Sequence, residues 1–337
     1  MAQIMQRIGN LFDQLCTLEN LLQAWKNARK GCGSTPESSR FFCELERELI
    51  SLQSALLDGT WHPSPYRFFE IYDPKQRRIA VAEFRDRVVH HAVVQVLEPH
   101  YERVFIHDSY ATRKGKGVHA AVFRAREYMQ RNDWYLKSDI EKFFDSVDHQ
   151  TLMGTLERKI KDTRFLKVCS AIILHGGTDG KGLPIGSRTS QFFANVYLDQ
   201  LDHFLKERMG VKYYVRYMDD FVVFDNNRQY LKDLRVRVDS FLADELKLSL
   251  KPSATFLNQH LNGLPFLGRR IFRNTTRLHQ KHARRITKRL AYREKQYVSG
   301  DISEDLFLQS VNSYWAMLSF YPELEGFRNS LLNKNTT

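Results

Sequence analysis

The 337-residue sequence lacks an apolar run of the ~18 residues needed to cross a membrane. Its first fifteen residues are amphipathic and too polar for a secretory signal peptide. The four cysteines show no Cys-x-x-Cys spacing, the histidines have no partners at zinc-ligand spacing, and there is no internal repeat. These absences disfavour membrane proteins, disulfide scaffolds and zinc modules. They favour a cytoplasmic protein with reduced thiols.

The chain has fewer acidic residues, 39, than basic residues, 51. The net charge is +12, and the isoelectric point is near 9.5. Such a surface attracts polyanions, and no long basic helix with a clean apolar face indicates a membrane surface instead. The imbalance is strongest over 269–295, which holds eleven Lys and Arg but a single acid, Glu294. We expect a separate basic helical module there, and nucleic acid as the ligand.

Apolar spacing and turn residues predict the elements. An aromatic and β-branched hairpin is expected around "VRYMDDFVVFD", and another hairpin is expected with its turn at Asp73 and Pro74. The remaining predicted elements are helices over 18–31, 41–57, 85–105, 150–175 and 228–247, a strand over 134–139, a long helix opened by the Gly/Pro loop near 180–187, and a strand pair near 263–272.

Two neighbouring acids, Asp219 and Asp220, interrupt an apolar hairpin, and Asp139 ends another predicted strand. Antiparallel pairing can bring all three together. Clustered carboxylates repel one another unless cations lie among them, and hard oxygen ligands suit Mg²⁺. Two such ions about 3.5–4 Å apart can activate a 3′-hydroxyl and stabilise a leaving pyrophosphate. The alternative is that Asp219 and Asp220 are ordinary turn residues.

The motifs resemble those of reverse transcriptases over residues 15–325. "RYMDDFVVF" and "SDIEKFFDSVDH" resemble the catalytic segments, "PKQRRIAVAEFRDRVVHHAV" and "SYATRKGKGVHAAV" the fingers, and "FLGRRI" the primer grip. The resemblance implies an α+β right-hand polymerase. It implies an N-terminal extension and fingers over 1–133, a palm over 134–268 with a fingers portion near 150–185, and a small basic helical thumb over 269–330.

One segment narrows the subfamily. Relatives commonly carry QGxxxSP where this chain reads "IGSRTSQ", and that variant is similar to reverse transcriptases of diversity-generating retroelements. The resemblance implies copying of a template RNA with errors at adenines, an RNA–cDNA duplex product, and a small basic pentameric accessory protein as partner. Alternatives are a stand-alone defence enzyme, a retron or group II intron relative, and, from another class, an inactive RNA-binding scaffold.

By resemblance, Asp139 and Asp219 hold two Mg²⁺ ions, with the carbonyl of Ile140 as a backbone ligand. Asp220 is the third acid, which either contacts metal or tunes the local field. Phe144 matches an aromatic that excludes a 2′-hydroxyl and so selects deoxynucleotides. Its alternative role is that of a core aromatic.

Further residues are expected near the nucleotide. Lys75 and Arg77 lie in the fingers hairpin and can close on a triphosphate, whereas Arg78 alternates to the other face. The alternative is a solvated charged turn. The other expected residues are Gly186, whose backbone can approach the nascent base pair, Ile185 and Gln191, which would flank the nucleotide, and Lys251, which is either a general acid for pyrophosphate or a surface lysine.

Basic side chains are expected to bind the template and primer. Arg85 and Arg87 are candidates for the template backbone. Arg113 lies in the Gly-flanked loop "RKGKG" and either approaches template phosphates or belongs to a mobile exposed loop. In the expected thumb, Arg284, Arg285 and Lys288 would contact duplex phosphates. Such contacts do not depend on the base sequence and weaken as the salt concentration rises.

Overall fold

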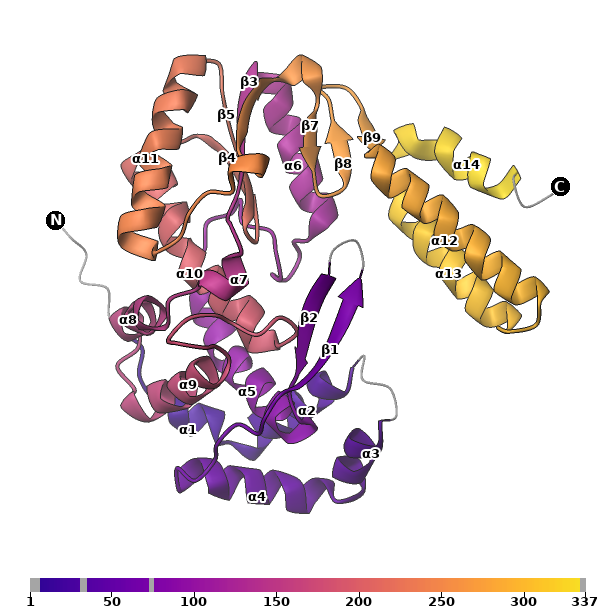
Figure 1. Ribbon diagram of the computed structural model, residues 1–337. Helices are drawn as coiled ribbons and strands as arrows, with labels where there is room; N and C mark the ends of the chain where they lie inside the picture. Colours follow the sequence, from indigo (N-terminus) through magenta and orange to yellow (C-terminus); the bar gives the residue numbers. More distant parts are fainter. Residues whose placement is uncertain (1–6, 31–34, 73–75, 334–337) are drawn as a thin grey trace.

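A four-stranded antiparallel sheet organises the centre of the molecule in a computed structural model that describes residues 7–30, 35–72 and 76–333 (Figure 1). The strand order is β4-β5-β3-β6, so β5 and β3 are central. The bounds are β3 (Trp134–Asp139), β4 (Tyr213–Tyr217), β5 (Asp220–Asp225) and β6 (Phe256–Gln259). The predicted strand and hairpin are confirmed, and β6 was not predicted.

Helices cover both faces of this sheet because its strands alternate two apolar sets. Val222 and Phe224 belong to a buried cluster with α6 (Val118–Arg131), whereas Phe221 and Val223 belong to the larger core. That larger core includes α10 (Arg188–His203) and α11 (Arg228–Leu246). A π-helical turn, η1 (Phe204–Arg208), extends α10. The sheet is thus held in place from both sides.

The N-terminal part is helical, as predicted, and lies below the sheet in Figure 1. Its helices are α1 (Leu11–Leu15), α2 (Leu18–Arg29), α3 (Pro36–Cys43), α4 (Leu45–Leu57) and α5 (Phe84–Tyr101). The single helix expected over 41–57 is wrong, because Glu44 leaves helical geometry with φ −115° and ψ 30°. The helices that follow β3 are α7 (Phe143–Ser146), α8 (His149–Lys159) and α9 (Thr163–His175).

Two further sheets flank this core. The hairpin of β1 (Arg67–Tyr72) and β2 (Gln76–Val81) stands apart as a two-stranded ribbon. A three-stranded sheet contains β7 (Leu264–Phe266), β8 (Arg269–Ile271) and β9 (Thr276–Leu278). The expected palm–thumb boundary at residue 268 falls between β7 and β8, so the helical part begins later. Short 3₁₀ turns, η2 (Pro252–Ala254) and η3 (His260–Asn262), lie on either side of β6.

A helical hairpin projects from the body (Figure 1). It consists of α12 (Gln280–Val298) and α13 (Glu304–Ser319), followed by η4 (Pro322–Leu324) and α14 (Glu325–Asn333). Tyr321 anchors its base: the residue is 1 % exposed, and its hydroxyl lies 3.0 Å from Nδ1 of His119 in α6. Among the described helices, none combines the length and the apolar character that crossing a membrane requires.

Candidate active site

A two-residue turn, Met218 and Asp219, joins β4 to β5. Tyr217 pairs with Asp220 across it, and Met218 has φ 57°, in the left-handed region that such tight hairpin turns use. On the neighbouring strand, Asp139 pairs directly with Asp220. The three acids therefore meet at one end of the sheet. Their convergence is present in the structure, and their catalytic role stays a prediction.

Burial makes negative charge unfavourable at this turn. It raises the pKa of Asp219, and the nearby Asp139 raises it further, while Arg77 and Lys137 act in the opposite direction. Burial also raises the pKa of Asp220 to about 7, although the ammonium of Lys137 opposes the shift from 2.9 Å. A cation beside these carboxylates would relieve the repulsion.

The oxygen atoms near the turn include a backbone carbonyl as well as carboxylates. Backbone bonds run from Lys251 N–H to the Asp139 carbonyl (2.8 Å) and from Glu141 N–H to the Ser249 carbonyl (3.0 Å). This bridge leaves the intervening carbonyl of Ile140 unused. Two carboxylates and a carbonyl suit ions that complete their shell with water and substrate phosphates.

Asp220, for which the sequence left direct metal contact open, has a cationic partner in the structure. Its Oδ1 is engaged by Lys137, a residue that the sequence reading did not single out. Across residues 7–30, 35–72 and 76–333, no group of three or more His, Cys, Asp or Glu is arranged to hold a metal ion. The roles of Asp139, Asp219 and Asp220 as metal ligands therefore stay predictions, and the contact with Lys137 concerns one of the two carboxylate oxygens of Asp220.

A buried ion pair lies beneath the turn and was also missed. The guanidinium of Arg216 donates to both carboxylate oxygens of Asp202 at 2.7 and 2.6 Å, and both side chains are 0 % exposed. Arg216 also donates to the Met218 carbonyl and to Asn195 Oδ1, each at 3.1 Å. The turn is therefore tied to α10. The available signal was a charged residue alternating with the apolar residues of a buried strand.

The fingers hairpin docks beside the acids through a glycine. Ala80 N–H donates to the Ile185 carbonyl at 2.8 Å. Gly186 has φ 123°, and a Cβ there would lie 2.6 Å from the Ala80 carbonyl oxygen. In the structure, the backbone of Gly186 closely approaches strand β2. The approach to a nascent base pair that the sequence suggested stays a prediction. Arg77 shares a strand face with Phe69, Ile71 and Ile79 through the register, and its charge lowers the pKa of Asp219. Arg77 therefore lies within electrostatic range of Asp219.

Residues 72–271, more than half of the chain, match the family described as reverse transcriptase (RNA-dependent DNA polymerase). The chain belongs to the reverse transcriptase family. Enzymes of this family generally use divalent metal ions and deoxynucleoside triphosphates. The matched segment contains all three acids, the fingers strand β2 and the buried pair beneath the turn.

Relatives and solved structures agree with this assignment. The chain is 27 % identical over 281 residues to protein YkfC of Escherichia coli, covering 69 % of this chain and 73 % of that protein. It is 30 % identical over 170 residues to the group II intron-encoded protein LtrA of Lactococcus lactis, covering 48 % of this chain but 28 % of LtrA. Apo telomerase from Candida tropicalis is similar in fold, with TM-score 0.52, 12 % identity, and coverage of 67 % of this chain and 49 % of that chain. The fold is a right-hand polymerase fold.

In this reverse transcriptase, Phe144 is half-buried and Phe143 is a core residue, 2 % exposed. The Phe144 carbonyl accepts a hydrogen bond from Leu183 N–H at 2.7 Å, so the Phe144 backbone lies beside the start of the loop that carries Ile185. Ile185 and Gln191 are half-buried. The backbone of Lys251 bonds Asp139, which places this lysine at the acids. Lys75 lies outside the described residues.

The three predicted template arginines differ in their contacts. Arg113 is 5 % exposed at its side chain and donates to the Glu102 carboxylate and to the carbonyls of Ile106 and Ser109. This geometry holds the loop together and does not support a template contact by Arg113. Arg85 donates to Ser51 Oγ at 3.0 Å, and Arg87 lies over the Phe84 ring at 5.2 Å.

The projecting hairpin carries the basic residues expected of the thumb. Arg284 and Lys288 are exposed and one turn apart, and Arg285 is half-buried. Exposed basic residues continue along the same face of α12, at positions Lys281 and Lys295. A stripe of this kind fits the phosphates of a duplex.

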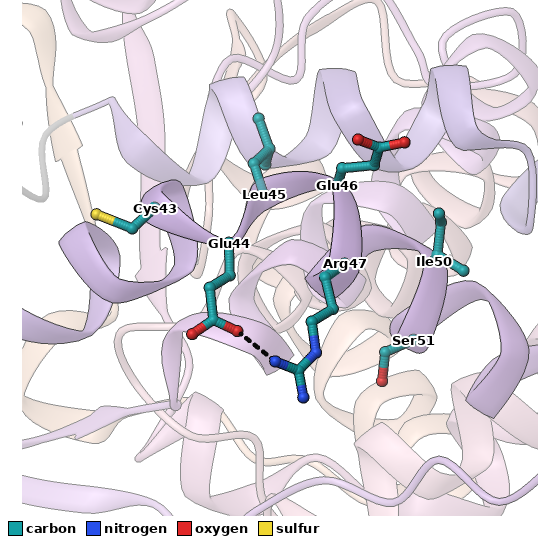
Figure 2. Close-up of a pocket in the computed structure, with 7 residues that line it drawn as sticks. All are labelled: Cys43, Glu44, Leu45, Glu46, Arg47, Ile50 and Ser51. Atoms are coloured by element: carbon teal, nitrogen blue, oxygen red, sulfur yellow. Dashed lines mark hydrogen bonds and ion pairs between the residues drawn. The ribbon is translucent and has the colours of Figure 1, made fainter.

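Two surface hollows of the described residues lie away from the acids. One of about 670 Å³ lies over α3 and α4, where its lining residues surround the exposed Glu44–Arg47 ion pair (Figure 2). Another of about 410 Å³ is lined by residues of α8, α10, η1 and α11. Neither of these two hollows is lined by a predicted site residue.

Proposed function

We propose that the protein is an RNA-templated DNA polymerase of a diversity-generating retroelement, which copies a template RNA into cDNA with errors at adenines. The observation that carries the polymerase activity is the register that sets Asp139 against Asp220, beside the turn that presents Asp219. The "IGSRTSQ" segment supports the subfamily.

In this mechanism, Asp139 and Asp219 would hold two Mg²⁺ ions together with the Ile140 carbonyl. Ions bound there would supply activation of the primer 3′-hydroxyl and stabilisation of the leaving pyrophosphate. Arg77 binds the triphosphate from the fingers side, and Lys251 donates a proton to pyrophosphate. Phe144 excludes a 2′-hydroxyl, so deoxynucleotides are selected.

Primer extension on an RNA template tests the activity. Asp219→Ala and Asp139→Ala should each lower incorporation at least a thousandfold while leaving RNA binding within about threefold of wild type, because each removes a group that acts on charge developing in the transition state. Wild-type extension excludes the inactive-scaffold alternative. Failure of wild type to extend any primed template would remove the proposal.

Ile185 supports the proposed low fidelity. A polar side chain at this position can hydrogen-bond the incoming sugar, whereas isoleucine cannot, so one geometric check is missing. Ile185→Gln should lower misincorporation at adenines several-fold, measured by sequencing cDNA made on the cognate RNA with and without a small basic accessory protein. Unchanged errors would contradict this role.

A group II intron-derived enzyme is the second candidate, and the similarity to LtrA favours it. Neighbouring genes separate the two. A template repeat beside an imperfect copy in a target gene supports the diversity-generating element, whereas an intron RNA structure around the coding sequence supports the alternative. A stand-alone defence enzyme or a retron would have neither.

A further inference from the structure

Lys137 is a buried lysine behind the acids. It lies in β3, which is hydrogen-bonded on both sides by β5 and β6, and it is 8 % exposed. Its Nζ is 2.9 Å from Asp220 Oδ1, and the two side chains are 10 % and 20 % exposed. Lysines are almost never buried to this extent unless they are paired. The sheet therefore contains a specific charge pair two residues from Asp139.

The strand register creates this pair. Asp139 lies opposite Asp220, and Lys137 lies opposite Val222, so Lys137 and Asp220 are diagonal neighbours on one face. On its other side, Lys137 lies opposite Phe256 of β6. Both directly opposing side chains are apolar, which leaves the lysine stem packed and its ammonium directed along the strand toward Asp220. The backbone hydrogen bonds of β3 with β5 and β6 fix the positions of both residues within the sheet.

The pair changes the charge that a divalent ion would meet. Three carboxylates converge at the turn, but one of them carries its own counter-ion. Removing the ammonium would leave a third uncompensated negative charge beside Asp139 and Asp219, where partial burial strengthens electrostatic interactions. Removing the pair together would leave the remaining charge balance unchanged.

We propose that Lys137 is a positioning residue that holds Asp220 out of the metal shell, so that Asp139 and Asp219 are the acids that bind the ions. This inference rests on the proposed function of those two acids. Asp220 then acts as a fixed partner of the sheet rather than as a ligand, and Lys137 sets the affinity for the ions.

The test compares Lys137→Met with the double variant K137M/D220N in the full-length chain. Mg²⁺ alone is titrated by calorimetry, and the Mg²⁺-dependent rise in unfolding midpoint gives a second measure of its dissociation constant. Lys137→Met should bind Mg²⁺ about tenfold more tightly than wild type. The double variant should return to within about threefold of wild type. Lys212→Met, which removes an exposed lysine before β4, is the matched control and should not change binding.

Two outcomes would overturn the inference. Loss of Mg²⁺ binding by tenfold or more in the double variant would make Asp220 a ligand. An unchanged dissociation constant in Lys137→Met would show that its charge does not act on the ions. The double variant buries no charge at this position, so it remains informative if Lys137→Met does not fold.

Primer extension separates this inference from the proposed function. If wild type binds Mg²⁺ but does not extend a primer, the polymerase proposal fails, and the calorimetric comparison still decides the role of Lys137. If wild type extends and the double variant loses Mg²⁺ binding, the polymerase proposal stands and the positioning role of Lys137 fails.

Discussion

The buried pair of Arg216 and Asp202 shows how an ion pair can hold the turn between β4 and β5 in place. Both side chains are fully buried, and the guanidinium also holds the Met218 carbonyl. Asp202→Asn should lower the free energy of unfolding by about 3–5 kcal/mol, because a buried guanidinium loses its counter-ion. Urea unfolding followed by circular dichroism measures this change.

The exposed Arg47–Glu44 pair provides the control. Arg47→Ala removes an ion pair whose arginine side chain is 82 % exposed, so the change should stay below about 0.5 kcal/mol. Equal effects of the two substitutions would contradict the assigned role of the buried pair.

At the scale of single residues, the sequence predicted the acids but not their partners. Two adjacent carboxylates between apolar runs stand out because their burial is unfavourable without a cation. Lys137 and Arg216 are also charged residues within apolar strands, so each needs a partner of opposite charge. A single charged residue in a strand does not reveal which acid it faces. That choice depends on the register of distant strands and on the position of α10. Arg113 illustrates the converse, because its Gly-flanked loop gave no sign of the inward ion pair with Glu102.

At the scale of elements, docking of the fingers hairpin depends on Gly186. Gly186→Ala should destabilise the protein by about 3 kcal/mol and displace β2, because the new Cβ would collide with the Ala80 carbonyl. Gly210→Ala is the matched control: Gly210 also has positive φ, 65°, but no atom lies within 4 Å of its added Cβ. It should lower stability by about 1 kcal/mol. Thermal unfolding compares the two, and equal losses would exclude the collision.

Elements with strong local patterns were predicted well. The strand over 134–139 and the helix over 228–247 correspond closely to β3 and α11. The break at Glu44 was not predictable, because Phe41, Leu45 and Leu49 keep helical spacing across it. Strand β6 was missed because its four residues are all half-buried and show no alternation. Only its pairing with β3 defines it.

At the scale of the whole molecule, acid stability should depend on buried histidines. Burial lowers the pKa of His90 to about 3, and the neighbouring charges of His91 and His175 act in the same direction. Between pH 6.5 and 3, the unfolded chain therefore binds a proton that the folded chain does not. Stability falls as the pH falls, by up to about 1.4 kcal/mol per pH unit for this group.

His90→Gln should remove that contribution to the pH slope, measured by urea unfolding at several pH values between 4 and 7. The exposed His62→Gln is the control for loss of an imidazole. A slope equal to that of wild type in His90→Gln would contradict the assignment.

Duplex binding should depend on the basic stripe of α12. Replacing Arg284 and Lys288 by alanine should weaken binding of an RNA–DNA hybrid about tenfold at 0.1 M salt and reduce the salt slope by about 2, since each phosphate contact contributes about 0.9. Fluorescence anisotropy at several salt concentrations measures both. The exposed Lys232 and Arg235 of α11 form the control pair, and an unchanged slope in the α12 variant would exclude these contacts.

The projecting hairpin acts as a lever. Nineteen residues of α12 extend roughly 28 Å from a base that Tyr321 fixes against α6. A tilt of about 10° at that base would move the far tip by about 5 Å, comparable to one helical turn. Small rearrangements near His119 would therefore be amplified at the far tip of the hairpin.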